Sequence, residues 1–361
     1  MTGDPGAVAV PQAPGAICPS CGAPVGAADS FCESCGTELA PPMVSAAPPG
    51  YEAECAVCSV DPEAPPGSIT AEGYCETCGR KVPSGRDHSE LDLALLAGVT
   101  DRGLRHARNE DAMALATADV PGGPVAIAVV CDGVSTSPRP DDASLAAAQT
   151  SVRVLLTAAR RGDDPGEASL AAVHSAHHAL TAMSSPGEAP SATYISAVVG
   201  GNAVTVCWLG DSRAYWLSTG PDTVRLSTDD SLAEELVARG TMDEAHALAT
   251  PQAHVITRWL GADLAEPEPH VVRFEPPGPG VVLVCSDGLW NYRPEAEALA
   301  ELALPAAFTD PAGAAAELVK FAIDAGGMDN ITVVLVPFPL ASFPDEPPHP
   351  KTVPVWRVPT V

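Results

Sequence analysis

Basic residues are scarce in this sequence. It has 19 Lys and Arg residues against 46 Asp and Glu residues, and its formal net charge at pH 7 is −27. No Lys or Arg occurs before Arg80. Nucleic-acid phosphates and anionic membrane surfaces are bound by clusters of Lys and Arg. The composition therefore argues against nucleic acid or a membrane surface as a main partner.

Long apolar runs and a basic N-terminal start are also lacking. Without them we expect neither a membrane-spanning helix nor a secretory signal, and hence a cytoplasmic protein with reduced thiols. Aromatic residues make up only 4% of the chain, but hydrophobic residues together reach 46%, which suffices for a core. The 38 Pro and 31 Gly residues indicate that appendages accompany this core.

The cysteines are concentrated near the N-terminus. Eight of the eleven form four Cys-x-x-Cys pairs, namely Cys18/Cys21, Cys32/Cys35, Cys55/Cys58 and Cys75/Cys78. Two residues between thiolates let both reach one tetrahedral ion, and the Gly that follows three of the pairs permits a tight turn. We predict two structural zinc ribbons, each holding one Zn2+ ion, at residues 14–38 and 54–82. Interleaved pairing of the cysteine pairs also satisfies two ions. Disulfides would fit a secreted chain, which we do not expect here, and redox motifs open a helix after a strand, whereas these pairs occur among Pro, Gly and Ser.

The rest of the chain divides by composition. Residues 39–53 are a Pro/Ala-rich linker, residues 91–337 form the main domain, and residues 338–361 are a Pro-rich C-terminal tail. Within the main domain, two consecutive helices at 141–161 and 165–183 interrupt runs of short apolar strands, the first expected at 93–99. This order does not fit a regular βαβ alternation. It predicts an α+β fold, with antiparallel sheets packed face to face and helices outside.

Acidic residues recur at turns beside these apolar runs. They occur in RNED (108–111), CDG (131–133), LGDSRAY (209–215), CSDGLW (285–290) and MDNITVVLV (328–336). Each motif alone is an ordinary turn sequence. Carboxylates at the ends of several strands, however, converge at one edge of a sandwich, where they repel one another unless divalent cations neutralise them. The set of motifs therefore predicts a metal centre.

A family resemblance rests on motifs that follow one another in order over residues 91–337. They are TDRGLRHARNEDA (100–112), CDGVS (131–135), LGDSRAY (209–215), STDDSLAEELVARG (227–240), ITRWLG (256–261), CSDGLW (285–290) and DNITVVLV (329–336). The chain resembles the metal-dependent serine/threonine protein phosphatases of the PPM, or type 2C, family. The resemblance implies a central antiparallel β-sandwich flanked by helix pairs (α-β-β-α), here preceded by the two zinc ribbons.

The resemblance also implies roles for individual residues. Asp132 would bridge two Mn2+ or Mg2+ ions, with the Gly133 carbonyl as a further ligand. Asp287 and Asp329 would hold one of the ions. Such ions lower the pKa of a bound water, which then attacks phosphoserine or phosphothreonine in a protein.

Three more acidic residues surround this implied centre. Glu110 and Asp111 would act around the second ion, largely through its waters, and Asp211 matches the position that can help bind a third, weaker ion. A phosphatase with an appended targeting module suggests bacterial signalling that opposes a Ser/Thr protein kinase. The ribbons resemble modules that contact other proteins.

The sequence departs from the family at three places. His106 occupies the position of a phosphate-gripping Arg, and Arg105 or Arg108 beside it is an alternative for that task. The loop DGVSTSPRP (132–140) has no His, so the general acid is unassigned, while its hydroxyls and Arg139 can bind a phosphate. Asn291 replaces an Asp, which weakens the third metal site. Two other functions stay open: a catalytically weak regulator that binds phosphoproteins, and an adaptor that works through its ribbons.

Overall fold

The structure, a computed structural model, describes residues 74–79, 85–243, 246–247, 250, 255–264 and 266–341, together with three short strands nearer the N-terminus. These strands are β1 (Ala16–Ile17), β2 (Pro24–Val25) and β3 (Val44–Ser45). The chain divides into two units, Met1–Met43 and Val44–Val361. In the first unit, β1 and β2 pair as antiparallel strands. Six of the eight predicted zinc ligands lie outside the described residues, the exceptions being Cys75 and Cys78.

Two six-stranded antiparallel sheets form the centre of the second unit. The first has the order β14-β10-β9-β7-β6-β3 and the second the order β12-β11-β15-β16-β5-β4. The strands of the first sheet besides β3 are β6 (Asp111–Val120), β7 (Gly123–Asp132), β9 (Tyr194–Gly200), β10 (Ala203–Leu209) and β14 (His270–Phe274). Those of the second are β4 (His88–Asp92), β5 (Ala97–Asp101), β11 (Arg213–Leu217), β12 (Val224–Arg225), β15 (Gly280–Cys285) and β16 (Ile331–Phe338). A short ladder joins β8 (Ser191–Ala192) to β13 (Leu260–Gly261).

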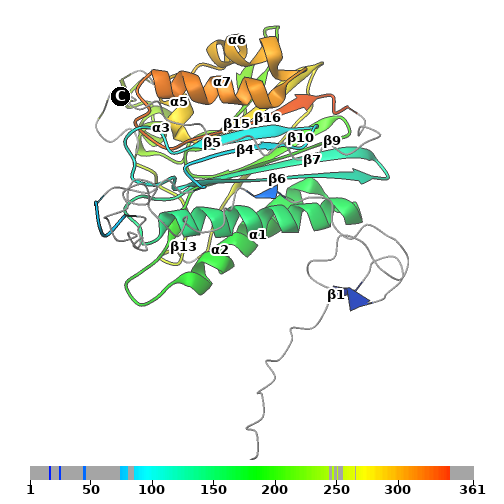
Figure 1. Cartoon of the computed structure of the whole chain (residues 1–361). Helices are drawn as coiled ribbons and strands as arrows, with labels where there is room; N and C mark the ends of the chain where they lie inside the picture. Colours follow the sequence, from blue (N-terminus) through cyan, green and yellow to red (C-terminus); the bar gives the residue numbers. More distant parts are fainter. Residues whose placement is uncertain are drawn as a thin grey trace, which may run out of the picture. The chain divides into compact units, whose positions relative to one another are not determined.

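Helices cover the outer face of each sheet in the second unit (Figure 1). α1 (Pro140–Arg161) and α2 (Pro165–Met183) pack on the first sheet, and α6 (Ala296–Ala307) and α7 (Pro311–Asp324) pack on the second. Two shorter helices are α3 (Leu232–Ala238) and α5 (Asp287–Trp290). The α-β-β-α order predicted for the main domain is confirmed. None of the described helices combines the length and the apolar character needed to cross a bilayer.

Three apolar layers hold the second unit together, one between the sheets and one under each helix pair. Alternation along β6 shows how they arise, because Met113 and Leu115 face the second sheet while Ala112 and Ala114 face the helices. Small side chains on this face of β6 meet alanines on α1, among them Ala147. The helix therefore packs closely over the strand whose first residue is Asp111.

The start of the main domain differs from the expected strand at 93–99. The apolar stretch there is split by a turn between β4 and β5, in which Ala94 has a φ of 64° and its N–H donates to Asp92 Oδ1 at 2.9 Å. Such an Asx turn competes with a continuous strand. The second sheet begins with β4 at His88, three residues before the predicted start of the main domain at 91. Its strand β16 extends to Phe338, one residue past the predicted end at 337. Val44 and Ser45, inside the predicted linker, pair with β6.

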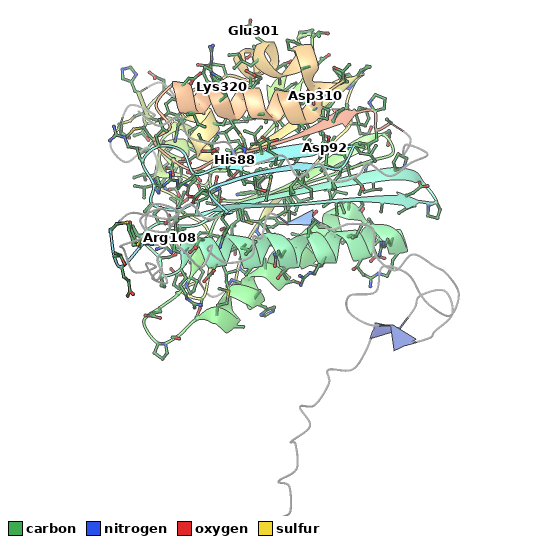
Figure 2. All side chains as sticks on the ribbon, viewed as in Figure 1. His88, Asp92, Arg108, Glu301, Asp310 and Lys320 are labelled. Atoms are coloured by element: carbon green, nitrogen blue, oxygen red, sulfur yellow. The ribbon has the colours of Figure 1, made fainter. Side chains whose placement is uncertain are left out.

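His88 on β4 (Figure 2) makes stability depend on pH. Its Nδ1 lies 2.7 Å from Asp101 Oδ2 and its Nε2 lies 3.1 Å from Glu90 Oε1. The hydrogen bond to Asp101 raises the pKa of His88, against an opposing effect of burial. A raised histidine pKa stabilises the folded state fully below the unfolded pKa of about 6.5, and this contribution is lost as the pH rises through the folded pKa.

We therefore expect His88→Gln to unfold more easily than the unsubstituted chain at pH 6 and to differ less at pH 9. Because the imidazole is partly exposed, the difference at pH 6 should stay below about 1 kcal/mol. Urea unfolding of both proteins at the two pH values measures it. An equal difference at both pH values would show that His88 contributes through packing and not through its charge.

Candidate active site

Strand ends and the turns beside them bring five aspartates to one end of the sandwich. Asp111 and Asp132 are direct partners in the β6–β7 ladder, at the first residue of β6 and the last of β7. Asp287 follows β15 as the first residue of α5, and Asp329 lies just before β16. Asp211 lies in the turn between β10 and β11. The structure thus brings together carboxylates that are up to 218 residues apart in the sequence, Asp111 and Asp329 being the extremes.

Burial and mutual repulsion both disfavour negative charge on this carboxylate cluster. Burial raises the pKa of Asp132 well above its ordinary value, and the charges of Asp111, Asp287, Asp329 and Asp211 raise it further. Burial likewise raises the pKa of Asp287, again with help from its acidic neighbours. The pKa of Asp211 rises to about 7, chiefly through burial. Charges that repel in this way are stabilised by a cation among them.

Hydrogen bonds orient Asp111 and leave one of its oxygens free. Ser286 Oγ and Thr332 Oγ1 donate to Asp111 Oδ2 at 2.6 Å and 2.7 Å. Both bonds lower the pKa of Asp111, but burial outweighs them and the pKa rises to about 6. The buried Oδ1 of Asp111 has no hydrogen-bond partner among the described residues, and neither has the buried Oδ1 of Asp287. Each of these carboxylates therefore presents an unused acceptor.

The donor set fits a hard divalent cation. The cluster offers only oxygen atoms, which suit Mg2+ and Mn2+ better than zinc. In the part of the chain that the structure describes, no three His, Cys, Asp or Glu side chains form a ready-made cage for an ion. Mg2+ does not need one, because it usually keeps several waters and takes one or two carboxylates. The unpartnered oxygens and the mutual repulsion are the observations that support this fit.

Two glycines allow the strand ends to approach one another. A Cβ at Gly133 would lie 2.3 Å from the Pro140 carbonyl oxygen, and a Cβ at Gly288 would lie 2.0 Å from that of Asn330. Any larger residue would therefore displace backbone. The Gly133 N–H also donates to the Glu110 carbonyl at 3.1 Å. Close packing of backbone around the carboxylates thus depends on these two residues.

Asn330 holds the loop that carries Glu110. Its Oδ1 accepts from the Glu110 N–H at 2.7 Å, and its Nδ2 donates to the carbonyls of Arg102 and Arg108 at 2.8 Å and 3.0 Å. Sequence reasoning did not assign a role to Asn330, Ser286 or Thr332. The only available signal was their place beside the acidic motifs.

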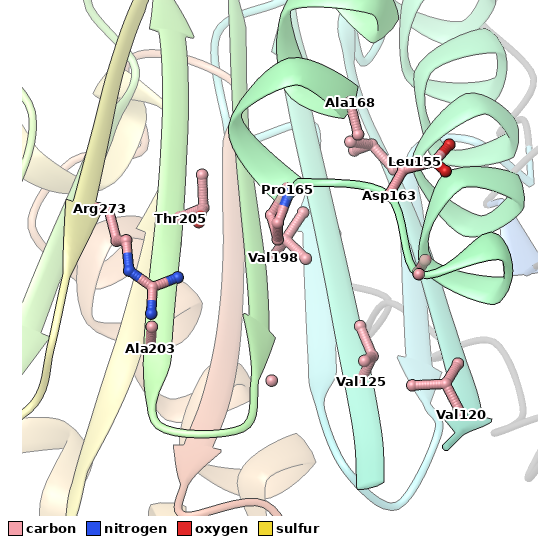
Figure 3. Close-up of a pocket in the computed structure, with 13 residues that line it drawn as sticks. Val120, Val125, Leu155, Asp163, Pro165, Ala168, Val198, Ala203, Thr205 and Arg273 are labelled. Carbon is pink, nitrogen blue, oxygen red and sulfur yellow. The ribbon is translucent and has the colours of Figure 1, made fainter. Parts of the chain in front are cut away.

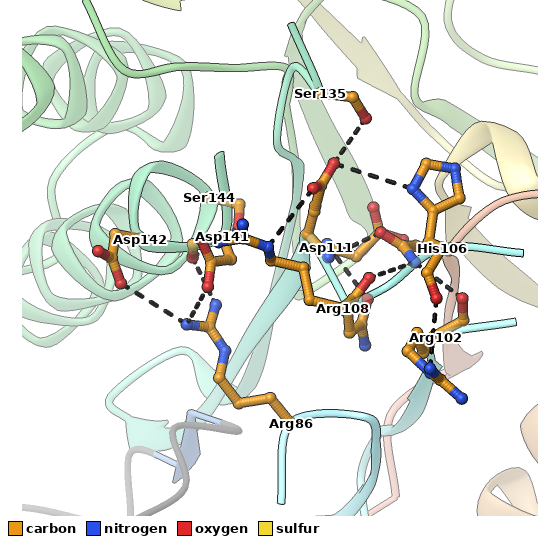
Figure 4. A network of polar contacts seen from close by, with 12 residues as sticks. Arg86, Arg102, His106, Arg108, Asp111, Ser135, Asp141, Asp142 and Ser144 are labelled. Atoms are coloured by element: carbon orange, nitrogen blue, oxygen red, sulfur yellow. Dashed lines mark hydrogen bonds and ion pairs between the residues drawn. The ribbon is translucent and has the colours of Figure 1, made fainter. Parts of the chain in front are cut away.

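Basic side chains border the carboxylates on one side (Figure 4). His106 Nε2 lies 3.1 Å from Asp329 Oδ1, and its Nδ1 lies 4.0 Å from Glu110 Oε2. Arg108 pairs with Asp141 at 3.1 Å and approaches Glu110 Oε1 at 3.9 Å. The structure thus places His106 against Asp329, at the border of the carboxylate cluster, and ties Arg108 to the start of α1.

The hydroxyl-rich loop after Asp132 is used mostly for structure. Ser137 Oγ accepts from the Ser191 N–H at 3.1 Å, and Arg139 Nη2 donates to the Met183 carbonyl at 2.5 Å. Ser135 Oγ donates to Glu110 Oε2 at 2.5 Å and is the hydroxyl of this loop that contacts the cluster. Among the side chains expected to bind phosphate from this loop, Ser135 thus contacts an acidic residue of the site.

The predicted third metal site is only partly formed by side chains. Asp211 is buried, and its carbonyl accepts from Trp290 Nε1 at 2.9 Å. Asn291, which stands where the family has an Asp, donates from Nδ2 to Asp287 Oδ2 at 3.1 Å. The amide therefore takes up one oxygen of Asp287 and adds no negative charge of its own.

Two features lie apart from the carboxylates. A cavity of about 170 Å3 lies between α1, α2 and the first sheet at the opposite end of β6 and β7, with Val120 and Val125 in its lining (Figure 3). Near the N-terminus, Gly79 has a φ of 70° and its N–H donates to the Cys75 carbonyl at 2.8 Å. This is the tight turn expected after a Cys-x-x-Cys pair.

Comparisons with known families match both parts of the chain. A family model described as protein phosphatase 2C matches residues 102–321, and one described as a zinc-ribbon domain matches residues 17–39. The serine/threonine phosphatase stp of Listeria innocua is 34% identical over 144 residues, which are 39% of this chain and 54% of stp. The matched segment thus spans about half the length of this curated relative.

Solved structures extend the similarity over a larger share of the chain. The PPM Ser-Thr phosphatase MsPP from Mycobacterium smegmatis, crystallised with cacodylate, gives a TM-score of 0.53 at 29% identity. The alignment covers 68% of this chain and 98% of MsPP. The catalytic domain of the phosphatase PstP in complex with two manganese ions gives a TM-score of 0.52 at 26% identity, covering 68% of this chain and 98% of that domain.

Proposed function

This chain belongs to the protein phosphatase 2C family, and from that membership we propose that it hydrolyses phosphoserine and phosphothreonine in proteins. The observation that carries the proposal is the buried carboxylate cluster, in which Asp111 and Asp287 each keep an oxygen without a hydrogen-bond partner among the described residues. Because the matched relatives are named phosphatases, an active enzyme is favoured over a catalytically weak regulator.

We assign the metal ligands as follows. Asp132 would be shared by two Mn2+ or Mg2+ ions, with the Gly133 carbonyl as a further ligand, and Asp287 and Asp329 would hold one of the ions. When bound, these ions acidify a water for attack on phosphorus and neutralise charge on the phosphate. The manganese-bound PstP domain supports the type of metal.

Other residues of the chain shape the site around that centre. Glu110 and Asp111 would act around the second ion, largely through its waters, and Asp211 would help to hold a weak third ion. Ser286 and Thr332 keep Asp111 turned toward the cluster, which is supported by their short hydrogen bonds to its Oδ2. We propose that His106 binds the substrate phosphate, because its imidazole contacts Asp329, a proposed metal ligand. Arg105, which is exposed and precedes His106, is the alternative for this role.

The N-terminal part is proposed to bind zinc and to contact other proteins. The zinc-ribbon match covers Cys18, Cys21, Cys32 and Cys35, which would ligate one Zn2+ ion. Cys55, Cys58, Cys75 and Cys78 would ligate a second. We further propose that the enzyme works in the cytoplasm, where it opposes a Ser/Thr protein kinase and the ribbons direct it to its substrates.

Metal dependence tests the proposed reaction. We expect the protein to release phosphate from a phosphothreonine peptide in the presence of Mn2+ or Mg2+ and to lose this activity in EDTA, since the carboxylates cannot position a nucleophilic water by themselves. Phosphate release with added Mn2+, added Mg2+ or EDTA measures the effect. Added Mn2+ after EDTA should restore the activity. Turnover that persists in EDTA would contradict a metal-activated water.

A further inference from the structure

Two exposed apolar side chains lie beside the carboxylate cluster. Among the described residues, Leu104 and Met328 are the most exposed large hydrophobic side chains, with 64% and 55% of their surface accessible. Scattered exposed apolar residues are normal in soluble proteins. These two, however, occur on adjoining loops, because the Leu104 N–H donates to the Gly327 carbonyl at 2.7 Å and Gly327 directly precedes Met328.

The two loops are held in place by backbone contacts. Gly103 and Gly327 have φ values of 69° and 51°, and a Cβ at Gly103 would lie 2.2 Å from the Asp329 carbonyl oxygen. The Met328 N–H donates to the Tyr292 hydroxyl at 2.9 Å. Left-handed glycines and close backbone packing fix the direction in which a loop presents its neighbours. The exposure of Leu104 is therefore built into the loop and is not the result of a loose end.

Both residues adjoin groups of the proposed catalytic centre. Met328 precedes Asp329, and Leu104 lies two residues before His106, whose Nε2 is 3.1 Å from Asp329 Oδ1. Successive residues of an extended peptide are about 3.3 Å apart. If the phosphorylated residue of a substrate peptide lies at the carboxylates, a neighbouring residue of that peptide is within reach of Leu104 and Met328.

The same loop is basic in an otherwise acidic protein. Arg102, Arg105 and Arg108 occur within seven residues of a chain that has only 19 Lys and Arg residues in total. Arg102 and Arg108 pair with Asp87 and Asp141. Arg105 is exposed and forms no ion pair with any residue that the structure describes, so it supplies the available positive charge. Positive charge beside an apolar pair complements a peptide that carries both a phosphate and an apolar side chain.

We propose that Leu104 and Met328 form a subsite for an apolar side chain next to the phosphorylated residue. The preferred substrates are then extended phosphopeptides with an aliphatic residue such as Leu flanking phosphothreonine or phosphoserine. This inference rests on the proposed phosphatase activity. The leucine side chain of the peptide would leave water and pack on Leu104 and Met328. This burial should raise kcat/KM for such a peptide about five- to tenfold.

Three substrates test the subsite with the full-length protein in Mn2+. Two phosphothreonine peptides differ only in Leu or Asn at the positions on either side of the phosphorylated residue, and 4-nitrophenyl phosphate has no peptide at all. We expect kcat/KM to be about five- to tenfold higher for the Leu peptide, mainly through KM. In Leu104→Asn and in Met328→Asn the ratio between the peptides should fall toward one. Phe308→Asn, which alters an exposed apolar residue at the end of α6, should keep the ratio.

Each failure has a distinct meaning. Equal kcat/KM for the two peptides, with clear hydrolysis of 4-nitrophenyl phosphate, would overturn the subsite and leave the phosphatase function standing. A preference for the Leu peptide that survives in both Leu104→Asn and Met328→Asn would also overturn it. If none of the three substrates is hydrolysed with Mn2+ or Mg2+, the phosphatase proposal itself is wrong and the subsite falls with it.

Discussion

Asp132→Ala should lower kcat/KM for a phosphothreonine peptide by about a hundred- to a thousandfold, since removing one electrostatic element of a preorganised site typically has an effect of this size. The reason lies in the position of Asp132. It is the last residue of β7, it pairs with Asp111 across the ladder, and the charges of four other aspartates act on it. A water molecule cannot replace the bridging carboxylate proposed here, because it carries no negative charge.

The same substitution should not destabilise the metal-free protein. The pKa of Asp132 is raised in the folded state, so at pH 7 its ionisation opposes folding, and this cost increases as the pH rises through the unfolded pKa toward the folded one. Without metal, Asp132→Ala should therefore unfold at the same temperature as the unsubstituted protein or at a higher one. A lost activity together with an unchanged or raised melting temperature in EDTA separates loss of the metal site from loss of the fold.

Asp119→Ala is the matched control. Asp119 lies on the same ladder as Asp111, near the opposite end of β6, where it pairs with Pro124 and is exposed. Phosphate release and thermal unfolding of both variants, with and without Mn2+, are the measurements. If Asp132→Ala kept more than about a tenth of the activity, the bridging assignment would have to be abandoned.

The acidic centre was predictable because strand ends determine where side chains meet. Asp111 and Asp132 belong to acidic motifs that adjoin apolar runs, and the structure places them directly opposite each other. A carboxylate at the end of a buried strand is costly without a positive partner. That physical argument identified the Asp132 position before any partner was known.

The supporting hydrogen bonds were not predictable by the same means. Ser286 and Asn330 resemble ordinary cap and turn residues, and their partners are 175 and 220 residues away in the sequence. Only the approach of β15 and β16 to the start of β6 turns them into supports for Asp111 and Glu110. The expected strand at 93–99 was wrong for a related reason, since apolar content does not reveal that Ala94 takes a left-handed turn.

Asp229→Ala should reduce the free energy of unfolding by about 3–5 kcal/mol, the usual result of leaving a buried charge without its partner. Arg213 Nη2 and Asp229 Oδ2 are 2.6 Å apart, and the side chains are only 1% and 4% exposed. A second contact joins Arg213 Nε to Asp229 Oδ1 at 2.9 Å. The alanine variant would bury an Arg213 guanidinium that has lost its counter-charge.

The Arg213–Asp229 pair also supports the candidate active site, through Trp290. The Arg213 guanidinium lies 3.6 Å from the centre of the Trp290 ring. Trp290 belongs to α5, the helix that begins with Asp287, and its Nε1 donates to the Asp211 carbonyl. Displacing Arg213 therefore disturbs both acidic loops. We expect Asp229→Ala to lose activity at temperatures where it is still folded, although Asp229 itself is not assigned a metal.

Two comparisons separate the buried charge from a general effect of substitution. Asp163→Ala breaks the exposed Arg161–Asp163 pair and should cost less than about 1 kcal/mol. The double variant Arg213→Met/Asp229→Leu removes both charges and should recover most of the stability lost in Asp229→Ala, because apolar replacements of a buried pair are often neutral. Urea unfolding of the three variants with an unchanged m-value gives the free energies. Equal losses in Asp229→Ala and in the double variant would mean that packing, and not the unpaired charge of Arg213, determines the stability at this position.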